Sequence, residues 1–303
     1  MDFILIDLEW NGSPLYKTGG YFNEIIEIGA VKLNSNMETI STFQTLVRPT
    51  VHKKLTGRVK RLTHITNDAV RAAVPFPKTF AGFAHWVGDG DNCFMSWGTG
   101  DLLVMIENLE HHRMPSLLSV MRNYCDAQEL CQHKLGIDRA KQPGLSAVAE
   151  QLGITCEDMD MHRALDDSLI TARCVQKVWD RELFDRICRP ADDEFIRRLL
   201  FKPYFICDTR NPAIKPEMLE TVCQQCGTPM TAEGKPWPRG RQVNIKYYCP
   251  QCDKSIIGRH QFRMRFDGLE HKLSWREIPP PEEETAEETA AEAAEDNSAG
   301  GEE

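Results

Sequence analysis

The sequence has 303 residues, of which 41% are hydrophobic, and a formal net charge of −9. This length suits one large domain with a real core and a small second one. No run of eighteen apolar residues occurs and the N-terminus has no basic leader, which excludes a membrane-spanning helix and argues against a signal peptide. A cytoplasmic location is the default expectation. The eleven cysteines, an odd number without secretion, argue against a disulfide framework.

The charges are segregated along the chain. Residues 282–303 contain ten acids and no bases, whereas Cys223–Arg276 contains ten Lys/Arg and four Asp/Glu. We expect residues 279–303 to form a disordered acidic tail, because aromatic and branched apolar residues are absent from it. The tail is either a solvated appendage or a competitor for the basic segment. A basic segment suits a polyanionic partner.

Three apolar segments open the chain, at Phe3–Glu9, Ile25–Leu33 and Phe43–Val47. Each has the length and composition of a strand, and the first is apolar throughout until its final acids. The connections between them are too short for crossover helices. We therefore predict an antiparallel meander.

The pattern then alternates between helix and strand. The predicted elements are a helix at Thr79–Val87, a strand at Cys93–Trp97, and helices at Leu102–His112, Leu145–Leu152 and Met161–Arg181. Thr99 or Asp101 could cap the second of these helices, and Gly153 ends the third. Antiparallel strands followed by alternating elements indicate a mixed α/β sheet with helices on both faces.

Asp7 and Glu9 lie two residues apart at the end of the first strand, so both side chains project from one face. Two buried carboxylates on an apolar strand are costly without a partner, and divalent metal ions would remove that cost. A surface pair of acids at a strand end is the alternative. The motif alone does not decide between them.

Further candidate groups follow at Asp101, which opens a helix after Gly98 and Gly100, and at His162 and Asp167. Asp101 is either a ligand or a helix cap. A histidine that is neutral near physiological pH suits a general base for water, although a structural role is the alternative. By helical phase, Asp166 lies about 100° from Asp167 and is expected to face solvent.

Taken together, these segments resemble the successive motifs of the DEDDh exonuclease superfamily. The resemblance covers roughly residues 2–180. It rests on Asp7-Leu8-Glu9, the strand Glu24–Val31, Leu62–Thr66 followed by Pro75-Phe76, Gly98–Asp101, Gly144-Leu145 leading to Leu152–Ile154, and His162–Asp167.

The resemblance implies a ribonuclease H-like fold and a 3′→5′ exonuclease that releases 5′-mononucleotides from single-stranded nucleic acid. It further implies that Asp7, Glu9, Asp101 and Asp167 hold two Mg²⁺ or Mn²⁺ ions. His162 would take the proton from the attacking water. The motif residues look closer to the exoribonuclease-like branch than to polymerase proofreading subunits, which favours RNA over DNA. Trp10 could stack on the terminal base or could belong to the core. Asn11 and the loop Gly12–Gly20 could line the substrate groove.

Two Cys-x-x-Cys pairs, Cys223/Cys226 and Cys249/Cys252, are separated by 22 residues. This spacing is typical of a structural zinc ribbon, with four thiolates around one Zn²⁺. A redox dithiol would not explain two pairs. Aromatic residues interleave with arginines in this segment, which favours nucleic-acid binding. The alternatives are a miniature aromatic core, a protein partner and docking on the first domain. The sequence does not show which protein, if any, would be such a partner.

The predicted organisation is an exonuclease domain at residues 1–190, a connecting segment at 191–218, a zinc ribbon at 219–278 and the acidic tail at 279–303. A second hypothesis is a nucleic-acid-binding adaptor whose nuclease domain is inactive. An inactive nuclease domain would have lost one or more of the four acids or the histidine, whereas this chain keeps all four acids and the histidine. A third hypothesis is a zinc-ribbon regulator whose N-terminal domain is unrelated to nucleases.

Overall fold

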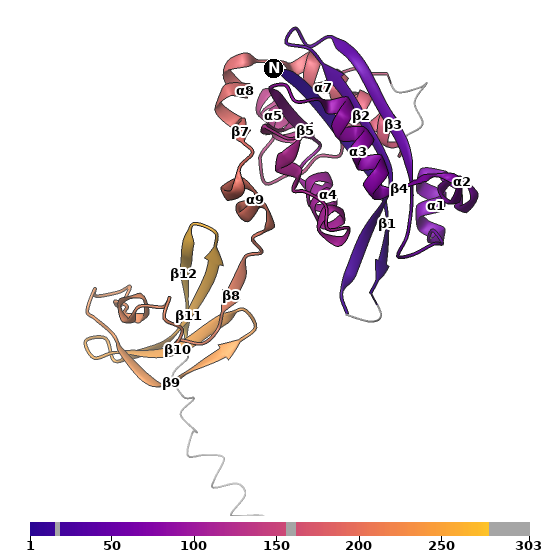
Figure 1. Ribbon diagram of the computed structural model, residues 1–303. Helices are drawn as coiled ribbons and strands as arrows, with labels where there is room; N and C mark the ends of the chain where they lie inside the picture. The colour runs from indigo at the N-terminus through magenta and orange to yellow at the C-terminus, as the bar shows by residue number, and fades with distance from the viewer. Residues whose placement is uncertain (16–18, 156–161, 279–303) are drawn as a thin grey trace, which may run out of the picture. The chain divides into compact units, whose positions relative to one another are not determined.

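The structure is a computed structural model that describes residues 1–15, 19–155 and 162–278. It divides into two compact units, with the boundary between Leu200 and Phe201 (Figure 1). This boundary falls within the predicted connecting segment. The predicted acidic tail lies outside the described residues. No described helix is both long enough and apolar enough to cross a membrane.

A seven-stranded mixed sheet forms the centre of the first unit, in the order β4-β3-β2-β1-β5-β6-β7. The strands are β1 (Asp2–Pro14), β2 (Tyr21–Leu33), β3 (Thr39–Arg48), β4 (Val74–Pro75), β5 (Asn92–Ser96), β6 (Asn123–Asp126) and β7 (Arg189–Pro190). β1, β2 and β3 form the predicted antiparallel meander, and β5 and β6 continue the sheet parallel to β1. The predicted fold class is confirmed.

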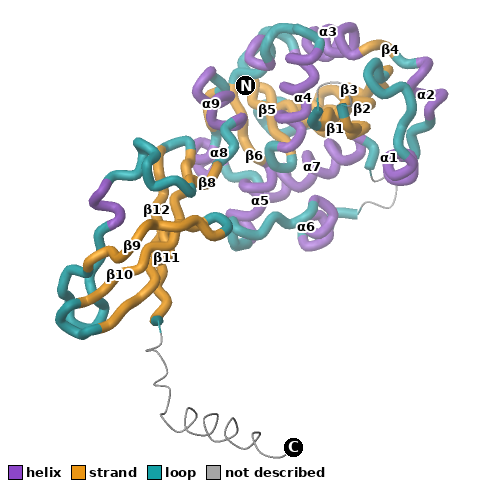
Figure 2. The backbone as a smooth tube through the Cα atoms, turned by 90° about the horizontal axis from the view of Figure 1, so that it is seen from below, coloured by secondary structure: helices purple, strands orange, loops and turns teal. Residues whose placement is uncertain are grey.

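Helices cover both faces of this sheet (Figure 2). They are α1 (Gly57–Thr63), α2 (Asn67–Ala72), α3 (Phe76–Val87), α4 (Gly100–His111), η1 (Leu117–Ser119), α5 (Ala127–Leu135), α6 (Leu145–Gln151), α7 (Ala164–Val178), α8 (Arg181–Ile187) and α9 (Asp193–Leu200). Phe3 and Leu5 of β1 pack in one core with α5, α7 and α8. Ile4, Ile6 and Leu8 point the other way, into a core with α3 and α4. The alternation of β1 therefore builds two apolar layers.

The helix expected over Met161–Arg181 is shorter than predicted. Its described part begins at Ala164 and ends at Val178, and α8 follows as a separate helix. The Asp180 side chain accepts a hydrogen bond from the Leu183 backbone N–H, which starts a new helix and ends the old one. Residue 161 lies outside the described residues.

The second unit contains β8 (Tyr204–Ile206), η2 (Pro216–Leu219), β9 (Thr231–Arg239), β10 (Gln242–Cys249), β11 (Lys254–Arg265) and β12 (Gly268–Glu277). These strands form one antiparallel sheet in the order β12-β11-β10-β9, and β8 also pairs with β11. One face carries a small core built around Val243, Ile245, Tyr247 and Phe262. Tyr247 and Phe262 of the interleaved aromatics therefore serve the miniature core.

Candidate active site and cysteine cluster

The strand β1 presents Asp7 and Glu9 on the sheet face that α7 covers. Both alternate with Leu8, whose side chain is buried in the opposite core. The pairing of β1 with β2 shifts by one residue between Glu9 and Trp10. Such a bulge changes the direction of the side chains that follow it. The extra residue, Ile26, lies on β2, whereas Trp10 of β1 packs against the same core as Leu8, on the opposite face from the two acids.

Asp101 reaches the same place from the first turn of α4. Its Oδ1 accepts a hydrogen bond of 3.1 Å from the backbone N–H of Leu8, the residue between the two acids of β1. Thr99 is the N-cap residue of α4, but its side chain makes no capping bond. Gly98 has φ +78° and its carbonyl accepts from Tyr124, which fixes the turn that delivers Asp101. Asp101 is thus tied to the strand, and it is not the helix cap.

Gly29 allows the start of α7 to lie directly on β2. It is opposite Asp7 in the pairing of β1 with β2, and a Cβ atom there would come within 2.1 Å of the Ala164 backbone. The Ser168 hydroxyl donates to the Gly29 carbonyl at 3.1 Å. A glycine is therefore required for Asp167, one turn into the helix, to approach Asp7.

Glu27 and Arg163 hold this helix start in place. Glu27 is fully buried, and its carboxylate accepts from Arg163 Nε at 3.0 Å, from Arg163 Nη2 at 2.6 Å and from the Ala164 backbone N–H at 3.2 Å. Gln44 donates a further bond of 2.9 Å. Neither Glu27 nor Arg163 was predicted as a site residue, although both lie inside the motifs that carry the family resemblance. An acid in the middle of an apolar strand was the available signal.

His162 lies just before α7, exposed and with φ +68°. One ligand atom each from Glu9, His162 and Asp167 lie within 4.8 Å of one another. Asp166 is absent from the residues that line the cavity at this site, whereas Asp167 lines it. The structure thus separates the two neighbouring acids as helical phase predicts.

A cavity of about 900 Å³ joins these groups. Its lining includes Asp7, Glu9, Trp10, Asp101, His162 and Asp167. Trp10 is half-buried: it packs against the core and also lines the cavity, and its stacking on a base stays a prediction. The volume fits a mononucleotide-sized ligand.

The structure does not bring every residue that was predicted to line the substrate groove to the cavity. Asn11 was a candidate for the groove, but its side chain is fully buried. It accepts from the Thr56 backbone N–H at 3.0 Å and anchors the loop before α1. Residues from α1, among them Arg58 and Leu62, line the cavity instead, together with Trp97 and Tyr21. Residues 16–18 of the predicted loop lie outside the described residues.

The carboxyl groups of this site raise one another's pKa values. Burial, followed by the charge of Asp167, raises the pKa of Glu9 to about 8. Burial raises the pKa of Asp101 to about 7 and that of Asp167 above its ordinary value. Burial and the charges of Asp101 and Asp167 hold the pKa of Asp7 well above its ordinary value. Four acids at one place cannot all ionise without a compensating cation.

This donor set fits divalent cations. Asp167 Oδ1 is buried and has no hydrogen-bond partner among the described residues, so one acceptor oxygen at this site is left unsatisfied. Carboxylate oxygens are the ligands that hard cations such as Mg²⁺ and Mn²⁺ prefer. A cation would satisfy this oxygen and offset the repulsion among the acids.

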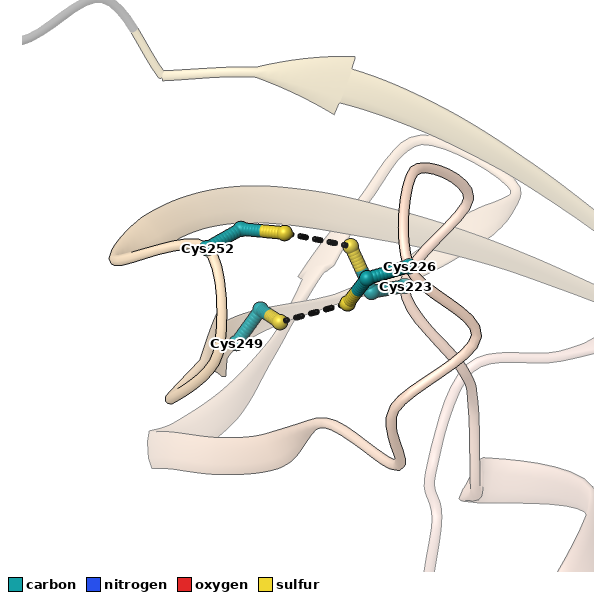
Figure 3. Close-up of side chains that lie close together, drawn as sticks. All are labelled: Cys223, Cys226, Cys249 and Cys252. Carbon is teal, nitrogen blue, oxygen red and sulfur yellow. Dashed lines mark hydrogen bonds between the residues drawn. The ribbon is translucent and has the colours of Figure 1, made fainter.

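The second unit brings its two cysteine pairs together (Figure 3). The Sγ atoms of Cys223, Cys226, Cys249 and Cys252 all lie within 4.8 Å of one another. Cys223 and Cys252 are 3.9 Å apart, and Cys226 and Cys249 are 3.5 Å apart. Gly227 and Asp253, which follow the two pairs, both adopt positive φ, so each pair lies in a tight turn.

The sulfur atoms of this cluster also fit a cation. Hydrogen bonds from Thr228 lower the pKa of Cys226 to about 6, and backbone N–H groups of Cys226 and Gln225 lower that of Cys223. The neighbouring Cys226 instead raises the pKa of Cys252 to about 12. The Cys226 thiolate therefore forms readily, and a cation would favour the thiolate form of the whole set.

Comparison with known proteins decides the family. The model of the Exonuclease family (RNase_T) matches residues 4–175. The chain belongs to this family. Together with the relatives described next, this match makes it a hydrolytic 3′→5′ exonuclease with a four-cysteine cluster, as the sequence motifs predicted.

Two curated relatives match at similar identity. The chain is 28% identical over 196 residues to the probable 3′-5′ exonuclease KapD of Bacillus subtilis (strain 168), covering 64% of this chain and 92% of KapD. It is 28% identical over 198 residues to ERI1 exoribonuclease 2 of Xenopus laevis, covering 58% of this chain but 28% of that protein. Both matches are shorter than this chain.

Among solved structures, the nuclease domain of 3′hExo, a DEDDh family member bound to rAMP, matches with a TM-score of 0.51 and 22% identity. The match covers 63% of this chain and 96% of that domain. At this identity the likeness supports the fold of the first unit.

Proposed function

We propose that this exonuclease shortens single-stranded nucleic acid, RNA in preference to DNA, by a two-metal-ion mechanism. Asp7, Glu9, Asp101 and Asp167 would hold two Mg²⁺ or Mn²⁺ ions. The observation that carries this proposal is the meeting of the four carboxylates in one cavity, where one buried Asp167 oxygen lacks a hydrogen-bond partner among the described residues.

Two divalent cations, when bound, supply Lewis-acid activation of a water and neutralise charge on the scissile phosphate. His162 would accept the proton of that water at a ring nitrogen, since it lies exposed at the cavity beside Glu9 and Asp167. Attack on the terminal phosphodiester would release a 5′-mononucleotide. Leu8 contributes by positioning, because its N–H orients the Asp101 carboxylate.

Trp10 would stack on the terminal base, since its ring lines the cavity next to Glu9. The RNA preference draws support from the Trp that follows the first motif and from the exoribonuclease named among the relatives. A 3′hExo domain that binds rAMP is consistent with it.

For the cysteine cluster we propose one structural Zn²⁺. Four protein sulfurs complete a tetrahedral site and leave no position for substrate. The fold of the second unit is consistent with a zinc ribbon, because the two turns that carry the cysteines flank a small antiparallel sheet.

The test is the shortening of 5′-labelled single-stranded RNA and DNA of one sequence with Mg²⁺, with Mn²⁺ and with chelator. Asp167→Ala should abolish a metal-dependent ladder that shortens from the 3′ end, whereas the matched variant Asp166→Ala should retain it. The faster substrate decides between RNA and DNA. Intact substrate from folded, zinc-loaded chain with both metals would favour the binding adaptor.

A further inference from the structure

The zinc-ribbon unit has a second sheet face that its core does not use. Along β10, Val243, Ile245 and Tyr247 enter the core, so Gln242, Asn244 and Lys246 face the other way. Directly paired residues of antiparallel strands share a face. The register of the neighbouring strands therefore identifies the side chains beside them.

This register places a row of aromatic and basic residues across the face. Asn244 is opposite Trp237 of β9 and Arg259 of β11, and Gln242 is opposite Arg239 of β9. Lys272 of β12 is opposite Gln261 of β11, and Arg276 of β12 is opposite Ile257 of β11. Asn244 itself is buried beneath its neighbours. We call the other residues of this set, together with Phe205, Arg241 and Arg263, the open face.

Two arginines of the open face meet on one aromatic ring. Phe205 of β8 is opposite Arg263 of β11, whose guanidinium lies 5.6 Å from the ring centroid. Arg241, from the turn between β9 and β10, lies 5.1 Å from the same ring. Stacking holds both guanidinium groups without neutralising them. Trp237 is 38% exposed, so a large aromatic surface remains available beside them.

The charge on the open face is strongly unbalanced. Lys246 pairs with Glu233 at 2.9 Å, and Lys272 pairs with Glu270 at 3.3 Å. Arg239, Arg241, Arg259, Arg263 and Arg276 form no ion pair with any described residue. A surface with five uncompensated arginines complements a polyanion and would be a poor match for most proteins.

We propose that the open face binds single-stranded nucleic acid, with Trp237 as a stacking surface for bases and the arginines as phosphate contacts. Arginine and aromatic side chains on one surface are the combination that recognises single strands without sequence preference. This proposal rests on the proposed function, because the bound strand would be the substrate upstream of the end being trimmed.

The test measures the affinity of full-length chain for a 5′-labelled single-stranded oligoribonucleotide by fluorescence anisotropy, in an Asp7→Ala background that prevents hydrolysis. Trp237→Ala should weaken binding by about tenfold, within the range of ~1–3 kcal/mol measured for a stacked base. Arg239→Ala with Arg259→Ala should reduce the slope of log affinity against log salt by about 1.4.

A matched control removes two charges elsewhere on the same unit. Arg210, which pairs with Asp208, and Lys254, which lies on the core side of β11, are both exposed. The double variant Arg210→Ala, Lys254→Ala should bind like the parent. If the Trp237 and arginine variants match this control while retaining zinc, the open face is not the binding surface.

Hydrolysis by chain with intact Asp7 separates the two proposals. Open-face variants should lose kcat/KM on a long oligonucleotide and keep it on a dinucleotide, which is too short to span a second site. If the open-face variants bind more weakly but the chain with intact Asp7 shortens no substrate, the proposed function is wrong and the proposal for the open face stands. If the substrate is shortened normally and the open-face variants keep their affinity, the proposed function stands and the proposal for the open face is wrong.

Discussion

The two units accommodate their clustered acidic and cysteine side chains in different ways. In the first unit, two large apolar cores lie on either side of the sheet, and the carboxylates occupy one end of it. In the second unit, the buried core has six residues and the cysteine cluster lies beside it. A large core can tolerate repelling acids that are kept for chemistry. We expect a core this small to need a bound metal to fold.

The largest expected effect tests the second half of this comparison. Cys249→Ser should unfold the second unit, because a structural zinc in such domains supplies about 10 kcal/mol or more of folding energy. The first unit should keep its own thermal transition. Calorimetry with zinc analysis measures both, and Cys207→Ser, outside the cluster, is the control. If the zinc-free chain instead unfolded in a single transition unchanged from that of the zinc-loaded chain, the second unit would not depend on zinc and the comparison between the units would fail.

The next effect tests the close approach of α7 to the sheet. Gly29→Ala should cost about 3 kcal/mol of folding free energy and should lower activity, because its Cβ would overlap backbone atoms. Gly82→Ala in α3 meets no atom within 4 Å and should instead stabilise the chain by about 1 kcal/mol. Urea unfolding compares the two. If the two substitutions changed the free energy of unfolding equally, α7 could move away from β2 without loss of stability.

Two buried glutamates allow a role in stability to be separated from a role in positioning the active site. Glu27 binds the start of α7, whereas Glu24 accepts from the backbone N–H groups of Thr50, Val51 and His52. Glu27→Gln and Glu24→Gln should each destabilise the chain, by about 2 kcal/mol. Only Glu27→Gln should also weaken Mn²⁺ binding and activity. Calorimetric titration with Mn²⁺ distinguishes them, and equal loss of metal affinity in both would remove the special role of Glu27.

The smallest effect concerns pH, and its sign should be opposite in the two units. Burial raises the pKa of Glu9 to about 8, so the folded metal-free first unit binds more protons than the unfolded chain between pH 4.5 and about 8. Its stability should fall as pH rises through that window. Burial lowers the pKa of His260 to about 4, so the second unit should lose stability as pH falls from 6.5 toward that value.

Melting temperatures of the two transitions from pH 5 to pH 8 measure this contrast, with an expected change of about 2 kcal/mol in the second unit. Zinc content must be followed in parallel, because acid also displaces zinc from thiolates. Mn²⁺ should stabilise the first unit more at pH 8 than at pH 6, since metal binding needs ionised acids. Parallel pH curves for both units would contradict the assignment.

The local elements of the site could be read from the sequence because each depends on short-range periodicity. A strand that alternates with period two places Asp7 and Glu9 on one side, and a helix with period 3.6 separates Asp167 from Asp166. Two tight Cys-x-x-Cys turns likewise predict a four-sulfur cluster. The paired use of Glu27 and Arg163 could not be read in this way, because 136 residues separate them. Asn11 was misassigned to the groove for the same reason, since its partner Thr56 lies 45 residues away.

The sequence by itself determined the fold class, the exonuclease family and the set of acids and cysteines, because these follow from residue order and spacing. Only the tertiary structure decided how the acids meet: Leu8 orients Asp101, and Gly29 admits α7 against β2. It also decided that Trp237 is exposed while Tyr247 and Phe262 are buried, which spacing could not show. The physical reason is that burial depends on which strands pair, and that pairing is a property of the whole sheet.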